Sequence, residues 1–254
     1  MTKQKLPIYS PTKISAFVEC PLKYKFLYVE KIGRFYYKPN PWNSFGGTLH
    51  RVLETLHRPG AESLTVDELL VSYNEMWNGV GYSSEEEEAR FRAEGERILR
   101  LYHANPASSD AKVVLTEKQV KWEMGDFVIA GRLDRLDEHP DGALEIIDYK
   151  SHLVSTTEED VRNSIAMSMY QVIVAHLYPG RRVFASIHCL AGGIKISAEL
   201  STRERDEVEA RTRTTASTIA TAEEYPPKQS ERCPKCDFHR LCAKQPWFGN
   251  EEHS

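Results

Sequence analysis

The chain has 254 residues, of which 41% are hydrophobic and 28% are charged, and its formal net charge is −4. This composition is ordinary for a soluble globular protein. No apolar run approaches the roughly 20 residues of a membrane-spanning helix, and the N-terminal sequence MTKQKLPIYSPTK lacks the apolar core of a signal peptide, so we expect a cytoplasmic protein that does not contact a membrane.

Basic residues are concentrated at the start of the chain. Residues 1–40 have a charge balance of +6, whereas residues 61–100 have a balance of −6. Aromatic residues are interleaved with the basic ones, and this combination suits DNA phosphates and stacked bases. A solvated face with aromatic core anchors is an equally good interpretation of this stretch alone. The candidate DNA contacts are Lys13, Lys23, Tyr24 and Lys25.

Amphipathic helices are predicted within residues 1–109. Ser10 followed by Pro11 is typical of an N-cap and a first helical residue. Three further segments place apolar residues at helical spacing, and these are 46–57, 65–77 and 84–105.

Strand-like patterns begin at about residue 110. Two alternating segments, KVVLTEKQVKWEM and DFVIAGRLDRLDE, flank a Gly125-Asp126 turn and predict a β-hairpin. The more apolar segment 143–151 predicts a third, central strand. The remaining predicted elements are a helix at about 158–178, strands at about 182–190 and 194–200, and a helix from Ser201 to about Glu224.

These elements predict one integrated α/β domain. Its core is residues 110–200. An N-terminal helical region, 1–109, and a C-terminal helix with a cysteine segment, 201–254, are expected to surround that core.

Two carboxylates are predicted on neighbouring strands. Asp148 and Lys150 are two residues apart, so both side chains leave the same face of their strand. Asp134 lies on the adjacent strand, where cross-strand neighbours are about 5 Å apart. Carboxylates about 4 Å apart repel by roughly 4 kcal/mol at an effective dielectric constant of about 20, and Mg²⁺ would compensate for this repulsion. Taken alone, the Asp-x-Lys pattern also fits two surface aspartates with a salt bridge.

Three of the five cysteines are clustered, which in a cytosolic chain indicates a metal rather than disulfides. Cys233, Cys236 and Cys242 have C-x2-C-x5-C spacing, but a structural zinc or a cubane iron–sulfur cluster usually has four ligands. Cys189 lies in a strand-like run and is interpreted as a small buried residue. Cys20 stands alone before a proline. His239 or Asp237 would complete a zinc site.

Taken together, these motifs resemble the PD-(D/E)xK nuclease superfamily. Gly131-Arg132-Leu133-Asp134, followed by Asp148-Tyr149-Lys150, is similar to its signature. GGTLHRVLE looks like the helix of the RecB-like branch whose histidine joins the metal shell, here His50. SPTKISAFVECPLKYKF is similar to the opening helix of iron–sulfur members, with a lone cysteine before proline. The resemblance covers about residues 10–242.

The resemblance implies a restriction-endonuclease-like mixed sheet flanked by helices, and it implies roles for particular residues. The Mg²⁺ or Mn²⁺ ligands would be His50, Asp134, Asp148 and the carbonyl of Tyr149. Lys150 would be the catalytic lysine, orienting water and stabilising charge on phosphorus. Gln171 would match the glutamine of a Q-x-x-x-Y helix that positions substrate and lysine, although position 175 is alanine, not tyrosine. A structural 4Fe–4S cluster, with zinc as the alternative, would be held by Cys20, Cys233, Cys236 and Cys242.

The function implied by the resemblance is a metal-dependent deoxyribonuclease. The favoured form is an exonuclease that acts on single-stranded DNA ends in repair, recombination or CRISPR adaptation. No G-x-x-x-x-G-K-[ST] phosphate loop is present, so a motor would have to come from a partner such as a helicase; a CRISPR-integration protein is another partner to consider. The alternative is a non-catalytic DNA-binding or scaffolding protein that keeps the nuclease fold.

Overall fold

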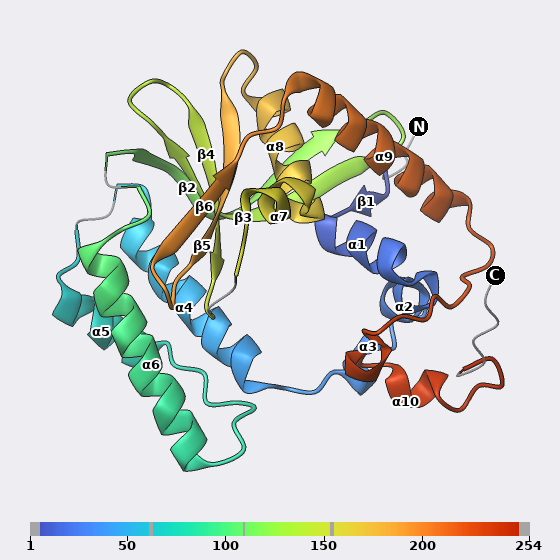
Figure 1. Ribbon diagram of the computed structural model, residues 1–254, viewed down its shortest axis with the longest axis horizontal. Helices are drawn as coiled ribbons and strands as arrows, with labels where there is room; N and C mark the ends of the chain where they lie inside the picture. The colour runs from blue at the N-terminus through green and yellow to red at the C-terminus, as the bar shows by residue number, and fades with distance from the viewer. Residues whose placement is uncertain (1–5, 61–62, 109, 153–154, 249–254) are drawn as a thin grey trace, which may run out of the picture.

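The computed structural model describes residues 6–60, 63–108, 110–152 and 155–248 (Figure 1). Its centre is a six-stranded mixed sheet with helices on both faces, which confirms the predicted α/β class. The strands are β1 (Ile8–Tyr9), β2 (Lys112–Glu123), β3 (Val128–Glu138), β4 (Leu144–Lys150), β5 (Val183–Cys189) and β6 (Ile194–Ala198). The helices are α1 (Pro11–Glu19), α2 (Pro21–Tyr24), α3 (Gly33–Tyr36), α4 (Pro41–His57), α5 (Val66–Glu75), α6 (Glu85–Ala104), α7 (Glu158–Asn163), α8 (Ile165–Leu177), α9 (Thr202–Thr221) and α10 (His239–Cys242). Within these described ranges, no helix is long and apolar enough to cross a membrane.

Two helix boundaries and one short strand differ from the prediction for local reasons. Helix α4 begins at Pro41 rather than residue 46, because the Asn40 side chain accepts the Asn43 N–H and the proline fits the first helical position. The helix predicted at 158–178 is interrupted at Ser164, whose side chain caps α8 by accepting the Met167 N–H. Strand β1 was missed because two residues carry no periodic signal.

The sheet opens beside one end of β4, and this opening positions the site. Strand β2 pairs antiparallel along the length of β3. On the opposite edge of β3, β1 pairs with Val128 and Ile129, whereas β4 pairs only from Arg135 onwards. Strand β4 therefore separates from β3 beyond the Arg135–Ile147 pair, and its last residues, Asp148 to Lys150, pair with β5 alone.

Two hydrophobic cores lie on opposite faces of the sheet. One core packs α1, α8 and α9 against the sheet, and it includes Ile146 of β4. The other packs α4, α5 and α6 against the sheet, and it includes Ile147 and Tyr149 of the same strand. Because successive strand residues point to opposite faces, the residues at the open end of β4 are directed alternately toward α8 and toward α4.

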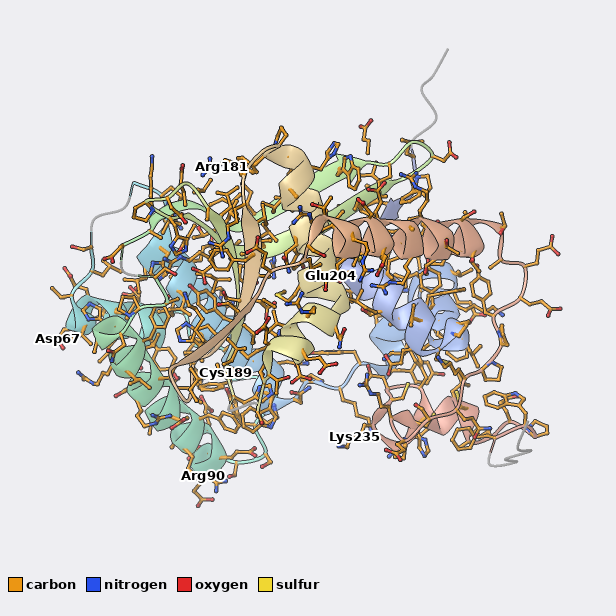
Figure 2. All side chains as sticks on the ribbon, turned by 45° about the horizontal axis from the view of Figure 1, so that its top comes forward. Asp67, Arg90, Arg181, Cys189, Glu204 and Lys235 are labelled. Carbon is orange, nitrogen blue, oxygen red and sulfur yellow. The ribbon has the colours of Figure 1, made fainter. Side chains whose placement is uncertain are left out.

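The cysteine segment lies on the other side of the molecule from α5 and α6. Figure 1 shows α10 on the opposite side from α5 and α6, and Figure 2 shows the labelled Lys235 of the cysteine segment apart from Asp67 of α5 and Arg90 of α6. The cysteine segment packs here on an N-terminal segment, because Phe26 and Tyr36 contact the ring of Phe238 at centroid distances of 5.0 and 5.4 Å.

Candidate metal centre and cysteine pocket

Three side chains from three elements meet where β4 leaves β3. They are His50 of α4, Glu117 of β2 and Asp134 of β3, and their ligand atoms lie within 4.8 Å of one another. His50 Nδ1 is 3.2 Å from Glu117 Oε1 and 3.5 Å from Asp134 Oδ2. Imidazole and carboxylate groups suit a divalent transition metal, and carboxylates suit Mg²⁺ or Mn²⁺.

The backbone of Tyr149 completes this cluster. Its N–H donates to Asp134 Oδ2 at 2.9 Å, in place of the ladder bond that β3 no longer supplies. Its carbonyl oxygen lies 3.2 Å from His50 Nε2. Both ring nitrogens of His50 therefore face oxygen acceptors. Burial by itself lowers the pKa of His50, but the hydrogen bond to Glu117 and the charges of Asp134, Glu117 and Asp148 outweigh burial and raise it.

The carboxylates crowd one another. Burial, together with the charges of Asp148 and Glu117, raises the pKa of Asp134 to about 6, although His50 acts in the opposite direction. Carboxylates held this close stay ionised together only when positive charge balances them, and a divalent cation would supply that charge. The donor set and its electrostatics therefore fit a metal ion.

Asp148 and Lys150 lie just beyond the cluster and form an ion pair with each other. Burial lowers the pKa of Lys150, but the charges of Asp148 and Asp134 more than reverse this effect and raise it, so the side chain is an ammonium at neutral pH. Asp148 belongs to no group of three mutually close ligands in the described chain, and its carboxylate pairs with Lys150.

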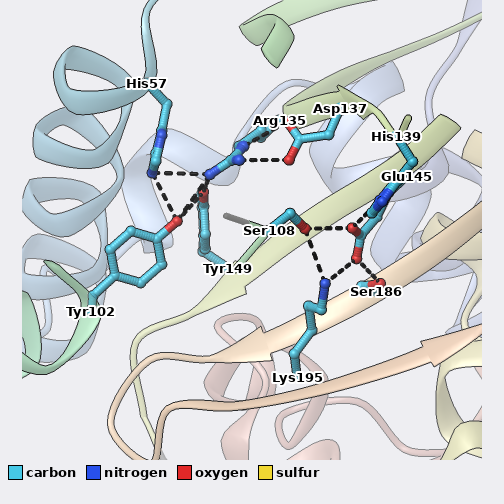
Figure 3. Close-up of polar contacts among 10 residues, drawn as sticks. All are labelled: His57, Tyr102, Ser108, Arg135, Asp137, His139, Glu145, Tyr149, Ser186 and Lys195. Atoms are coloured by element: carbon cyan, nitrogen blue, oxygen red, sulfur yellow. Dashed lines mark hydrogen bonds and ion pairs between the residues drawn. The ribbon is translucent and has the colours of Figure 1, made fainter. Parts of the chain in front are cut away.

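A buried ion pair anchors β4 beneath the site (Figure 3). Arg135 forms two hydrogen bonds with Asp137, and the two residues are 1% and 0% exposed. Arg135 Nη1 also donates to Tyr102 Oη at 3.1 Å, and Tyr102 Oη lies 3.0 Å from Tyr149 Oη. Burial and the charge of Arg135 lower the pKa of His57 to about 3, so its neutral ring accepts from Arg135 Nη1 at 3.0 Å.

The buried pair connects the two elements that form the metal centre. His57 lies two turns after His50 on the same face of α4, and Tyr149 contributes its carbonyl to the centre from β4. Arg135 therefore fixes the position of α4 relative to β4, on the side of the sheet away from solvent.

Four cysteines from both ends of the chain line one pocket. They are Cys20, Cys233, Cys236 and Cys242. The N–H of Lys228 donates to Cys20 Sγ at 3.4 Å, and that of Ser230 donates to Cys233 Sγ at 3.3 Å. Burial and the charges of the other three cysteines raise the pKa of Cys242 to about 11.

The described thiols do not form a ready-made tetrahedral zinc site. A tetrahedral zinc with Zn–S bonds of about 2.3 Å holds its sulfurs about 3.8 Å apart. Among the described residues, no three cysteine sulfurs lie within 4.8 Å of one another, and no such group includes His239. Backbone N–H donors to sulfur are also typical of iron–sulfur sites.

The chain matches the family model described as PD-(D/E)XK nuclease superfamily over residues 8–243. The chain belongs to this superfamily. Its restriction-endonuclease-like fold agrees with that membership. No curated protein matches the chain at a significant level.

A solved structure shares this fold at low sequence identity. A protein from Eubacterium rectale, provisionally named an exonuclease, is 13% identical with a TM-score of 0.53, over 91% of this chain and 86% of that one. A structure named SSO0001 is also 13% identical, with a TM-score of 0.42, over 95% of this chain and 89% of that one.

The predicted helix residue Gln171 forms a hydrogen bond with the segment that precedes α9. It is fully buried, and its Oε1 accepts the Leu200 N–H at 2.9 Å. Its neighbour Tyr170 is the residue that α8 directs toward the centre. The ring of Tyr170 packs on Gly131, where any Cβ would collide with it. Burial and the charges of Asp148 and Asp134 raise the pKa of Tyr170 to about 12.

The four candidate DNA contacts near the N-terminus all make contacts within the protein. Lys13 Nζ donates to the Ile8 carbonyl at 2.7 Å, and Lys23 and Lys25 pair with Glu19 and Glu30. Tyr24 is buried against Phe17, Tyr28 and Tyr225. The interpretation as aromatic core anchors therefore describes Tyr24 better than base stacking does.

Glu117 is the site residue that sequence reasoning missed. It lies opposite Asp134 in the β2–β3 hairpin, between the pairs Thr116–Arg135 and Lys118–Leu133. Its φ of 45° is unusual for a residue with a side chain, and such strain is concentrated at functional sites. A second oxygen of Glu117 pairs with Arg132 Nε at 2.9 Å.

Proposed function

We propose that this nuclease-superfamily chain is a deoxyribonuclease that requires Mg²⁺ or Mn²⁺ and removes nucleotides from single-stranded DNA ends. The observation that carries the proposal is the group of His50, Glu117 and Asp134 beside the Asp148–Lys150 pair. These groups lie in or next to an open cleft of about 1120 Å³ lined by His50, Glu117, Arg132, Tyr149 and Lys150.

The residues divide the chemistry between them. The ion would be held by His50, Glu117, Asp134 and the Tyr149 carbonyl. Asp148 would contribute to the same centre, because its charge already acts on the pKa of Asp134. The ion supplies Lewis-acid activation of the phosphate and of a water molecule. The Lys150 ammonium, held by Asp148, would donate hydrogen bonds to the negative charge that develops on the phosphate oxygens.

The test is cleavage of end-labelled single- and double-stranded DNA by the purified protein. We expect cleavage with Mg²⁺ or Mn²⁺ and none with EDTA, because both the phosphate charge and the attacking water need the cation. Shortening from one labelled end would give the polarity, and an endonuclease would leave internal fragments. Folded protein that binds DNA and cleaves none with either metal would favour the non-catalytic scaffolding alternative.

We further propose that the four cysteines hold a structural 4Fe–4S cluster. Joining residue 20 to residue 233 closes a very long loop, and the chain-entropy formula for cross-links gives about 5 kcal/mol for such a closure. Whole domains are stable by only about 5–15 kcal/mol. Loss of the cluster would therefore loosen α1 and α2 from the C-terminal segment.

Replacing Cys20 with serine is expected to remove the iron and to lower solubility and thermal stability together. Iron, acid-labile sulfide and visible absorption of anaerobically purified protein measure the first effect, and thermal unfolding measures the second. Cys189→Ala is the control, because Cys189 lies in β5, away from the cysteine pocket. The iron content of this variant should match that of wild type. Wild-type protein that contains zinc and no iron would contradict the cluster.

The proposed substrate, a single-stranded DNA end, would have to be produced by another protein. Since the sequence has no phosphate-binding loop of the Walker type, we propose that a helicase or a CRISPR-integration protein supplies DNA ends to this cleft.

A further inference from the structure

A second cavity adjoins the metal cleft, and Trp42 lines both. The second cavity, called the Trp42 pocket here, has a volume of about 450 Å³ and is open to solvent. Its walls include Trp42, Phe45, Phe91, Arg90, Ser151 and His152. Trp42, Ser151 and His152 also line the metal cleft, so the two cavities are neighbours.

Trp42 is exposed although its side chain is large and aromatic. It is the second residue of α4, 54% exposed, and it belongs to neither hydrophobic core. Its ring contacts Phe91 and His152 in edge-to-face arrangements, with centroid distances of 4.9 and 5.8 Å. These contacts hold the ring in place while much of its surface remains available to a ligand.

Helix α4 forms a continuous wall from Trp42 to the metal centre. Trp42, Gly46 and His50 are one turn apart, and eight residues of helix span about 12 Å. Gly46 and Gly47 both line the cleft; a Cβ at Gly46 would lie 3.3 Å from Ser151 Oγ, whereas a Cβ at Gly47 would meet nothing within 4 Å. Glycine inside a helix is unfavourable relative to alanine, but here it lets a ligand approach the helix backbone between Trp42 and His50.

The chemistry of the Trp42 pocket suits a nucleobase. Aromatic rings stack on the face of any base, and the polar groups of Arg90, Ser151 and His152 would meet the base edges. Arg90 lies near the start of α6, as labelled in Figure 2, and Glu94, one turn further along, also lines the pocket with its carboxylate paired to Arg97. Pockets of this size with aromatic walls and a few polar groups are typical ligand sites.

We propose that the Trp42 pocket binds one unstacked nucleobase of the DNA strand whose phosphate lies at the metal centre. The proposal rests on the proposed function and gives a reason why single-stranded DNA would be selected over a duplex. A base in a duplex is stacked and paired, so reaching the pocket would require its extrusion, whereas a base in a single strand is already available.

The test is a scan of single abasic positions along a labelled single-stranded oligonucleotide. Binding is measured in EDTA, where no cleavage is expected, so the result does not depend on catalysis. One abasic position near the strand end should weaken wild-type binding by about tenfold, the range expected for loss of one stacked base. Trp42→Ala should weaken binding of the intact strand by a similar factor and should show no further penalty at that position.

Two variants control for structure. Trp42→Phe keeps an aromatic ring and should retain the abasic penalty. Phe35→Ala removes an aromatic side chain that is 70% exposed but lines neither cavity, and it should bind intact and abasic strands as wild type does. Thermal unfolding of each variant checks the fold.

The outcomes separate this proposal from the proposed function. If wild type cleaves DNA with metal but binds every abasic strand equally, the nuclease assignment stands and the Trp42 pocket proposal is wrong. An equal loss of affinity for intact and abasic strands in Trp42→Ala also overturns it, because the ring would then act without contacting a base. Wild type that neither binds nor cleaves DNA overturns both.

Discussion

Replacing Glu117 with glutamine is expected to lower metal-dependent DNA cleavage by about 100-fold or more, the range seen when one electrostatic group of an active site is removed. The amide keeps the size of the side chain but removes its charge, and its NH₂ group cannot ligate a cation. Cleavage rates with Mg²⁺ and Mn²⁺ measure the effect. The increase in Tm caused by Mn²⁺ provides a second readout, because a metal stabilises the folded state only when that state binds it.

The matched control is Glu123→Gln, at the other end of β2 and opposite Val128. It makes the same chemical change on the same strand, away from the centre, so both the cleavage rate and the Mn²⁺ effect should match wild type. Asp148→Asn provides the rate of an inactivated site for comparison. If Glu117→Gln cleaves as fast as wild type, Glu117 is a partner of Arg132 and not a metal ligand.

The position of Glu117 opposite Asp134 can be predicted from the sequence. The predicted Gly125-Asp126 turn fixes the hairpin register, and the Met124 N–H indeed donates to the Phe127 carbonyl at 2.8 Å. Counting outward from that turn places position 117 opposite position 134. A third acidic residue facing the motif aspartate follows from the register alone. The motif itself includes only the acidic residues Asp134 and Asp148, so comparison with the motif does not identify Glu117.

Other features depend on three-dimensional packing that no local pattern encodes. Tyr170 and Gln171 differ by one residue, or 100° around α8, and only the packing of α8 on Gly131 decides which of them faces the centre. The approach of Cys20 to Cys233 spans most of the chain and was expected only from the resemblance. The exposure of Trp42 depends on where α4 begins, and that boundary lies five residues before the predicted one.

The largest expected loss of stability comes from Asp137→Ala. The change leaves the Arg135 guanidinium buried without its carboxylate, which costs about 3–5 kcal/mol in comparable buried pairs. For a chain of this size, we expect Tm to fall by roughly 10 °C. Glu138→Ala, one residue along β3, is the control. Its ion pair with Arg181 is partly exposed, so that variant should lose at most about 1 kcal/mol.

The DNA cleavage rate of a doubly substituted variant separates the contribution of the buried pair to protein stability from its contribution to positioning the metal centre. Arg135→Met combined with Asp137→Leu removes both charges and, as in other buried pairs, should recover much of the stability lost in Asp137→Ala. Since Arg135 also contacts His57 and Tyr102 beneath the metal centre, we expect this variant to fold but to cleave more slowly than wild type. Wild-type cleavage would mean that Tyr149 holds its carbonyl toward His50 without the buried pair, and that the pair contributes to folding alone.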